Sequence, residues 1–144
     1  MSQLQFWHHH GGVSVPDLEA AVDWYGRVLG FSVERRFPIP NIPAQVAMII
    51  NGDLRMELFE SPGAAPLPED RRTPDLDIRT HGNKHVSFVV GNVDTFAAEL
   101  ERRGADIVWV KRFAHGASIF IRDLAGNLIE FVEDAPPAGR PAQL

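Results

Sequence analysis

The sequence predicts an α+β domain built from two repeated units, each with the order strand, helix and three strands (βαβββ). Two segments carry the repeat: HGGVSVPDLEAAVDWYGRVLGF, which begins at His10, and HVSFVVGNVDTFAAELERRGADI, which begins at His85. Each begins with a histidine, continues as a short strand and then shows apolar residues at helical spacing. We place the two units at about residues 6–60 and 83–133, inside a single domain of residues 1–134, and expect the proline- and alanine-rich tail of residues 135–144 to be frayed.

Both helices are predicted from end signals and apolar periodicity. Asp17 is a suitable N-terminal cap for the first helix, and Gly30 a suitable stop. Gly104 ends the second helix in the same way. Apolar residues recur at steps of three and four: Leu18, Ala21, Val22, Tyr25, Val28 and Leu29 in the first helix, and Val93, Phe96, Ala97 and Leu100 in the second.

Strand-like stretches follow each helix. They cover residues 45–50 and 54–60 in the first unit, and 107–110, 117–122 and 128–133 in the second. A further strand around 31–37 has only a weak pattern, and three prolines (Pro38, Pro40 and Pro43) predict a loop after it. The repeat therefore accounts for most of residues 6–133 and leaves residues 61–82 as the link between the two units.

Composition narrows the classes of function. A chain of 144 residues with 44% apolar residues suits one well-buried domain. The formal net charge of -5 makes nucleic acid and anionic membranes poor partners, so a small molecule is the expected one. The absence of cysteine excludes thiolate chemistry and leaves imidazole and carboxylate as metal ligands. The first ten residues lack the features of a signal peptide, and we expect a cytoplasmic protein without a membrane span.

Four polar residues recur at matching places in the two units. Glu57 lies 47 positions after His10, and Glu130 lies 45 positions after His85. Strand alternation places each glutamate opposite its apolar neighbours, as Glu57 is opposite Met56. All four can therefore lie on the concave side of a curved sheet, away from the helices.

A histidine or glutamate on a strand is most often simply solvated. Here two of each occupy equivalent places, and two carboxylates brought close together without a cation would repel one another and lose hydration. A divalent ion removes that cost. The sequence therefore favours one metal site over four unrelated surface residues.

The same residues resemble the vicinal oxygen chelate superfamily, which contains glyoxalases, epimerases, extradiol dioxygenases and bleomycin-resistance proteins. VPDLEAAVDWYGRVLGF resembles its first-helix signature, and RDLAGNLIEFVE, with Asp123 and Gly126, resembles its last-strand signature. The resemblance covers residues 8–133. It implies two βαβββ modules that form a cupped sheet around one divalent metal ion, and a homodimer.

The resemblance also implies roles for individual residues. The metal ligands would be His10, Glu57, His85 and Glu130, with Glu57 and Glu130 also catalytic; zinc, nickel, cobalt, manganese and iron all suit such ligands. The pattern is closest to the glyoxalase I and methylmalonyl-CoA epimerase branch. It implies an epimerase, isomerase or lyase that moves a proton next to a carbonyl, with an acyl-CoA, a cyclic polyol ketone or a hemithioacetal as substrate.

Two other functions stay open. One is a ligand-binding or antibiotic-resistance protein of the same fold, although the four ligands argue against it. The other is a ring-cleaving dioxygenase, in which Phe120 would be a tyrosine and the position of Glu57 would be open. His8 is an alternative to His10 on the same strand face, and His81 and His115 lie in loop-like contexts from which they could reach a cavity.

Overall fold

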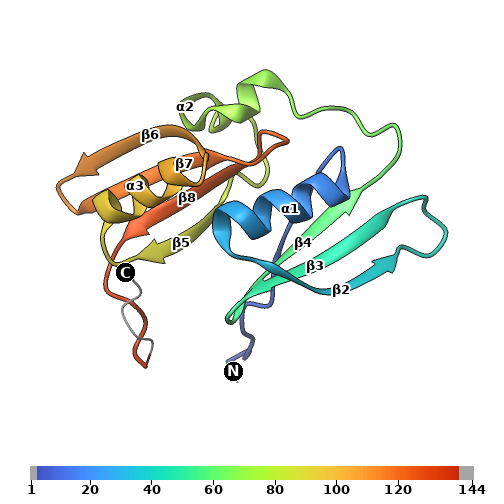
Figure 1. Ribbon diagram of the computed structural model, residues 1–144, viewed down its shortest axis with the longest axis horizontal. Helices are drawn as coiled ribbons and strands as arrows, with labels where there is room; N and C mark the ends of the chain where they lie inside the picture. The colour runs from blue at the N-terminus through green and yellow to red at the C-terminus, as the bar shows by residue number, and fades with distance from the viewer. Residues whose placement is uncertain (1–2, 140–144) are drawn as a thin grey trace.

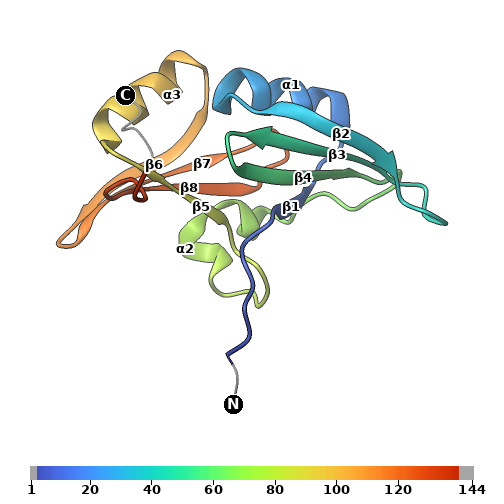
Figure 2. The same ribbon diagram turned by 90° about the horizontal axis from the view of Figure 1, so that it is seen from below.

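The computed structural model describes residues 3–139 and contains two four-stranded mixed sheets, one for each predicted unit. The first sheet has the strand order β1-β4-β3-β2 and the second has β5-β8-β7-β6. Figure 1 shows the two sheets side by side, and Figure 2 shows helices α1 and α3 together on one face of them. The α+β class and the βαβββ order are confirmed.

The first module contains β1 (Gly11–Ser14), α1 (Leu18–Leu29), β2 (Ser32–Pro38), β3 (Gln45–Asn51) and β4 (Leu54–Glu60). Asp17 caps α1 as predicted, because its side chain accepts a hydrogen bond from the Ala20 amide. Gly30 ends the helix with a φ of 74°, a left-handed conformation that glycine adopts without strain. The weakly patterned strand is real and ends at Pro38, which β2 tolerates because it is an edge strand.

The second module contains β5 (Val86–Val90), α3 (Val93–Arg102), β6 (Asp106–Phe113), β7 (Gly116–Arg122) and β8 (Leu128–Glu133). Asn92 caps α3 by accepting a hydrogen bond from the Thr95 amide. Strand β6 continues three residues beyond the predicted segment, because it pairs with β7 as far as Phe113. Of the tail, residues 135–139 are exposed and form no helix or strand, and residues 140–144 lie outside the described part.

One apolar core lies between the helices and the sheets and crosses from one module to the other. Tyr25, Leu58, Val93 and Ile119 belong to it and are almost fully buried. A polar contact also joins the modules, since the Tyr25 hydroxyl donates to Asp123 Oδ2 at 3.0 Å. Shared burial and this contact hold the two modules as one body. None of the helices in residues 3–139 has the length and apolar character needed to cross a membrane.

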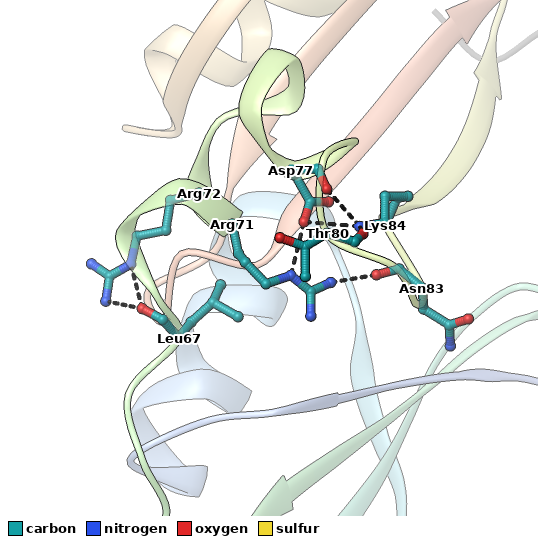
Figure 3. Close-up of polar contacts among 7 residues, drawn as sticks. All are labelled: Leu67, Arg71, Arg72, Asp77, Thr80, Asn83 and Lys84. Carbon is teal, nitrogen blue, oxygen red and sulfur yellow. Dashed lines mark hydrogen bonds and ion pairs between the residues drawn. The ribbon is translucent and has the colours of Figure 1, made fainter.

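The linker between the modules contains two short helices, η1 (Glu69–Arg72) and α2 (Pro74–Asp77), on the face of the sheets opposite α1 and α3 (Figure 2). A buried carboxylate organises it. Asp77 is 1% exposed and its Oδ1 accepts hydrogen bonds from Arg71 Nε at 2.8 Å and from Lys84 Nζ at 3.2 Å (Figure 3). Burial alone would raise the pKa of Asp77, but hydrogen bonds and positive charges from Arg71 and Lys84 outweigh it and hold the pKa below its ordinary value.

This carboxylate makes folding of the linker sensitive to acid. Because the folded-state pKa is the lower one, the charged Asp77 stabilises the fold above the ordinary aspartate pKa of about 3.9, and that stability is lost as pH falls through the folded-state value. We expect Asp77→Asn to lower the free energy of unfolding by about 1–3 kcal/mol at neutral pH. The difference from wild type should shrink as pH falls below about 4, which urea unfolding across the acid range measures.

Asp75→Asn is the matched control. Asp75 lies on the same short helix, but its side chain is 72% exposed and its contact with Lys111 Nζ is 3.5 Å long. Removing its charge should change the unfolding free energy by less than about 0.5 kcal/mol. An Asp77→Asn protein whose stability follows the wild type at every pH would contradict the role given to this carboxylate.

Candidate metal centre

His10 and Glu57 face each other on neighbouring parallel strands. In the β1–β4 ladder Gly12 pairs with Glu57, and His10 precedes Gly12 by two residues, so its side chain lies on the same face of the sheet. The distance from His10 Nε2 to Glu57 Oε2 is 3.1 Å. The side chains are 32% and 17% exposed, which leaves the pair accessible from one side.

His85 and Glu130 repeat this arrangement in the second module. Ser87 pairs with Glu130 in the β5–β8 ladder, and His85 precedes Ser87 by two residues. His85 Nε2 lies 3.3 Å from Glu130 Oε2, with side-chain exposures of 31% and 19%. The rings of His85 and Phe120 make an edge-to-face contact, with their centroids 4.8 Å apart. The matched spacing in the sequence therefore corresponds to matched geometry.

A tight turn before β8 sets the position of Glu130. Asp123, which is 5% exposed, accepts hydrogen bonds at Oδ1 from the amides of Ala125 and Asn127. Gly126 in this turn has a φ of 90°, and a Cβ there would lie only 2.9 Å from Arg72 Cδ. The backbone conformation therefore favours glycine, and any larger residue would also displace the Arg72 side chain. These are the residues of the last-strand signature.

Ser118 is a site residue that the sequence reasoning missed. Its hydroxyl donates to Glu130 Oε1 at 2.8 Å, and the residue is 4% exposed. Met48 pairs with Glu57 in the first sheet as Phe120 pairs with Glu130 in the second. Ser118 lies two residues before Phe120, so its equivalent on β3 is Val46, two residues before Met48. Valine offers no hydroxyl, so the two glutamates differ in their support. A serine among the apolar residues of a buried strand was the signal that could have identified it.

The structure brings the four predicted ligands together as two pairs and not as one cluster. Across residues 3–139, no group of three or more histidine, aspartate and glutamate side chains is close enough to hold an ion. Each pair presents one imidazole nitrogen and one carboxylate, which are suitable donors for zinc, nickel, cobalt, manganese or iron. The residues fit a divalent ion in kind, and each pair offers two possible donors.

The other histidines differ in how near they lie to these pairs. His8 and His81 are exposed, and His9 Nδ1 lies 2.6 Å from His10 Nδ1. His115 stacks on Phe113 with ring centroids 5.4 Å apart. It also lines a small cavity of about 100 Å³ to which Glu130 contributes. His10, and not His8, therefore holds the position next to Glu57.

A larger cavity of about 480 Å³ lies between the modules. It is lined by β1, by Leu67 and Arg71 of the linker, by residues 83–86, by Met56 of β4, and by Asn127 with Leu128 at the start of β8. Of the four predicted ligands, His85 lines this cavity. A molecule bound here would therefore lie next to the second His–Glu pair.

Known proteins resemble this chain over nearly its whole length. The human mitochondrial methylmalonyl-CoA epimerase is 27% identical over 132 residues, which cover 85% of this chain and 70% of that protein. The Bos taurus enzyme of the same name is 30% identical over 132 residues, covering 85% of this chain and 71% of the other.

Solved structures share the fold at lower identity. A glyoxalase family protein from Enterococcus faecalis superposes with a TM-score of 0.75 at 22% identity, covering 88% of this chain and 97% of the other. The trypanothione-dependent glyoxalase I of Leishmania major gives a TM-score of 0.68 at 18% identity, covering 90% and 87%.

A family model matches residues 7–131, which include both His–Glu pairs and the turn before β8. The chain belongs to the glyoxalase/bleomycin resistance protein/dioxygenase superfamily.

Proposed function

We propose that this protein is a metal-dependent epimerase, isomerase or lyase that moves a proton next to the carbonyl of a small substrate. The observation that carries the proposal is the duplicated His–Glu pair, with 3.1 Å between His10 Nε2 and Glu57 Oε2 and 3.3 Å between His85 Nε2 and Glu130 Oε2. The similarity to methylmalonyl-CoA epimerases supports an epimerase over the other two reactions. An acyl-CoA is then the favoured substrate class.

The chemistry needs a base and a way to stabilise negative charge on oxygen. A divalent ion held by His10, Glu57, His85 and Glu130 would supply that stabilisation when bound. A carboxylate within reach takes the proton from the carbon next to the carbonyl, and a proton is returned to the same carbon. Return of the proton on the opposite face inverts the configuration of that carbon. Glu57 and Glu130 occupy equivalent places in the two modules, which suits them to opposite faces.

The two glutamates have unequal surroundings, and this affects their roles. Ser118 holds one oxygen of Glu130 by a hydrogen bond, whereas Val46 faces the equivalent region beside Glu57. A fixed carboxylate is a better ligand because less freedom is lost when the ion binds. Phe120 packs on His85 and keeps one side of its ring from water. We therefore assign Glu130 and His85 mainly to holding the ion.

The assembly follows from the separation of the pairs. Because a single chain does not bring three or more ligands together within residues 3–139, we infer that two copies form a homodimer in which the first pair of one copy meets the second pair of the other. The N-terminal segment supports contact between copies. Leu4, Phe6 and Trp7 are 84%, 84% and 82% exposed, and a symmetric dimer would cover them.

Metal binding is the first expected property. Purified protein reconstituted with zinc, nickel, cobalt, manganese or iron should hold about one divalent ion per chain, and His85→Ala or Glu130→Ala should lose most of it. Ser118→Ala should weaken binding by about 10- to 100-fold because Glu130 loses its hydrogen-bond donor. Elemental analysis and metal titration measure both. Protein that takes up none of these ions after reconstitution would end the proposal.

Assembly is tested by mixing two defective proteins. One carries His10→Ala with Glu57→Ala, and the other carries His85→Ala with Glu130→Ala. Each alone should bind little metal, whereas an equal mixture, exchanged between copies, should regain about a quarter of the wild-type metal through mixed dimers. Light scattering should give twice the 16.0 kDa of one chain. A 16.0 kDa wild-type species that binds metal would disprove the shared centre.

Proton transfer is tested by exchange in deuterated water. Methylmalonyl-CoA, chosen from the similarity to the epimerases, should gain deuterium at its α-carbon in the presence of the metal-loaded protein. Glu57→Gln and Glu130→Gln keep a coordinating amide oxygen but cannot accept the proton. At least one should retain metal and slow exchange by about 100-fold or more. Two metal-loaded variants that exchange at the wild-type rate, or oxygen consumption by the wild type, would reopen the dioxygenase alternative.

A further inference from the structure

The cavity between the modules has an unbalanced charge. Arg71, Lys84 and His85 line it, and none of its lining residues is an aspartate or glutamate. The nearby Asp77 is buried behind the two cations and compensates only one of their charges. The wall that the linker presents to the cavity therefore keeps at least one net positive charge.

The two linker cations differ in how many of their donors are already used. Lys84 Nζ donates to the Asp77 carbonyl at 2.6 Å, to Asp77 Oδ1 at 3.2 Å and to the Thr80 carbonyl, which occupies its three hydrogens. Arg71 donates from Nε to Asp77 Oδ1 at 2.8 Å and from Nη2 to the Asn83 carbonyl at 2.5 Å. Its Nη1 has no hydrogen-bond partner within residues 3–139, and Figure 3 shows this nitrogen turned away from Asp77. Arg71 therefore has donors to spare beside the cavity.

The guanidinium is also held in place before any ligand arrives. Its side chain is 27% exposed and is fixed by the 1%-exposed Asp77 on one side and by the Asn83 carbonyl on another. A fixed planar fork loses little freedom when it binds a carboxylate or phosphate, and the fork matches the geometry of both groups. Another part of the wall is β1, an edge strand that is not hydrogen-bonded to β5 and so has backbone N–H groups to offer.

We propose that this cavity is the subsite for an anionic oxygen group of the substrate, a carboxylate or a phosphate, bound by the free edge of the Arg71 guanidinium. Identifying the anion as part of the substrate rests on the proposed function, but anion binding itself does not. The volume of about 480 Å³ suits a small acid or one end of a larger molecule. Because His85 lines the same cavity, the anchored group lies next to the second His–Glu pair.

Anion binding can be measured without metal and without turnover. The full-length chain is stripped with a chelator, dialysed free of it, and titrated at low ionic strength with malonate and separately with inorganic phosphate, with neutral malonamide as the uncharged probe. Calorimetry should detect at least one of the anions and not malonamide. Tighter binding of malonate identifies a carboxylate subsite, and tighter binding of phosphate identifies a phosphate subsite.

Two pairs of variants locate the binding. Arg71→Gln removes the proposed donor, and Arg79→Gln removes an equal charge from an exposed residue of the same linker that does not line the cavity. Arg71→Gln should raise the Kd of the bound anion by about 10- to 100-fold, whereas Arg79→Gln should leave it within about twofold.

Because Arg71 also contacts Asp77, Arg71→Gln could disturb folding of the linker. A second pair of variants therefore tests the same cavity without changing Arg71. Ser14 is exposed, lines the cavity from β1 and takes no part in the hydrogen bonds of Asp77. Ser14→Glu adds a negative charge there, and Ser14→Gln adds nearly the same bulk without charge. Ser14→Glu should weaken anion binding by about tenfold, an effect that salt reduces, and Ser14→Gln should not.

The results separate this inference from the proposed function. The inference would be overturned if neither anion binds at millimolar concentration. It would also be overturned if Arg71→Gln and Ser14→Glu both bind the anion as tightly as the wild type does. Either result counts even in a protein that exchanges the α-proton. Arg71-dependent anion binding by a protein that takes up no divalent ion on reconstitution would instead sustain the subsite and remove the proposed function. If both hold, Arg71→Gln should raise KM for methylmalonyl-CoA far more than it lowers kcat, because the anchor contacts the substrate away from the reacting carbon.

Discussion

The parallel pairing of β1 with β4 and of β5 with β8 is the constraint on which the rest of this structure depends. In each pair the strand after the histidine lies directly beside the strand that carries the glutamate, with Gly12 opposite Glu57 and Ser87 opposite Glu130. A parallel pair requires a long connection, and here that connection is a helix and two further strands. The helix covers one face of the sheet and so leaves the histidine and glutamate on the other. A shift of one residue in either register would turn the glutamate toward the apolar core.

The linker shows how a polar cluster can shape a site without taking part in its chemistry. Burying Asp77 removes a carboxylate from water, and the loss is offset only because Arg71 and Lys84 both reach it. Lys84 immediately precedes His85, so the same cluster that holds the linker also fixes the start of β5. Arg72 packs against the turn at Gly126, four residues before Glu130. The linker therefore supports both members of the second His–Glu pair.

The two modules are alike in backbone geometry and unlike in what surrounds their polar residues. The second pair has a hydroxyl donor in Ser118, an aromatic neighbour in Phe120 and a cationic cavity beside His85. The equivalents of Ser118 and Phe120 in the first module are Val46 and Met48, which are buried and apolar. A duplicated framework in this way presents similar polar pairs in two different surroundings.

Local patterns in the sequence were sufficient for the repeated βαβββ order, both helix caps of α1 and the face on which each glutamate lies, because these depend on periodicities of two and 3.6 residues and on the conformational preferences of Asp17 and Gly30. They also indicated that each histidine lies beside its glutamate, since similar spacings of 47 and 45 residues in a repeat give similar geometry. Only the tertiary structure decided that these residues form two separate pairs within one chain, that Ser118 supports Glu130 and that Asp77 directs Arg71 toward a cavity. These features depend on how the two modules and the linker pack against one another, and such contacts between residues distant in sequence leave no periodic pattern along the chain.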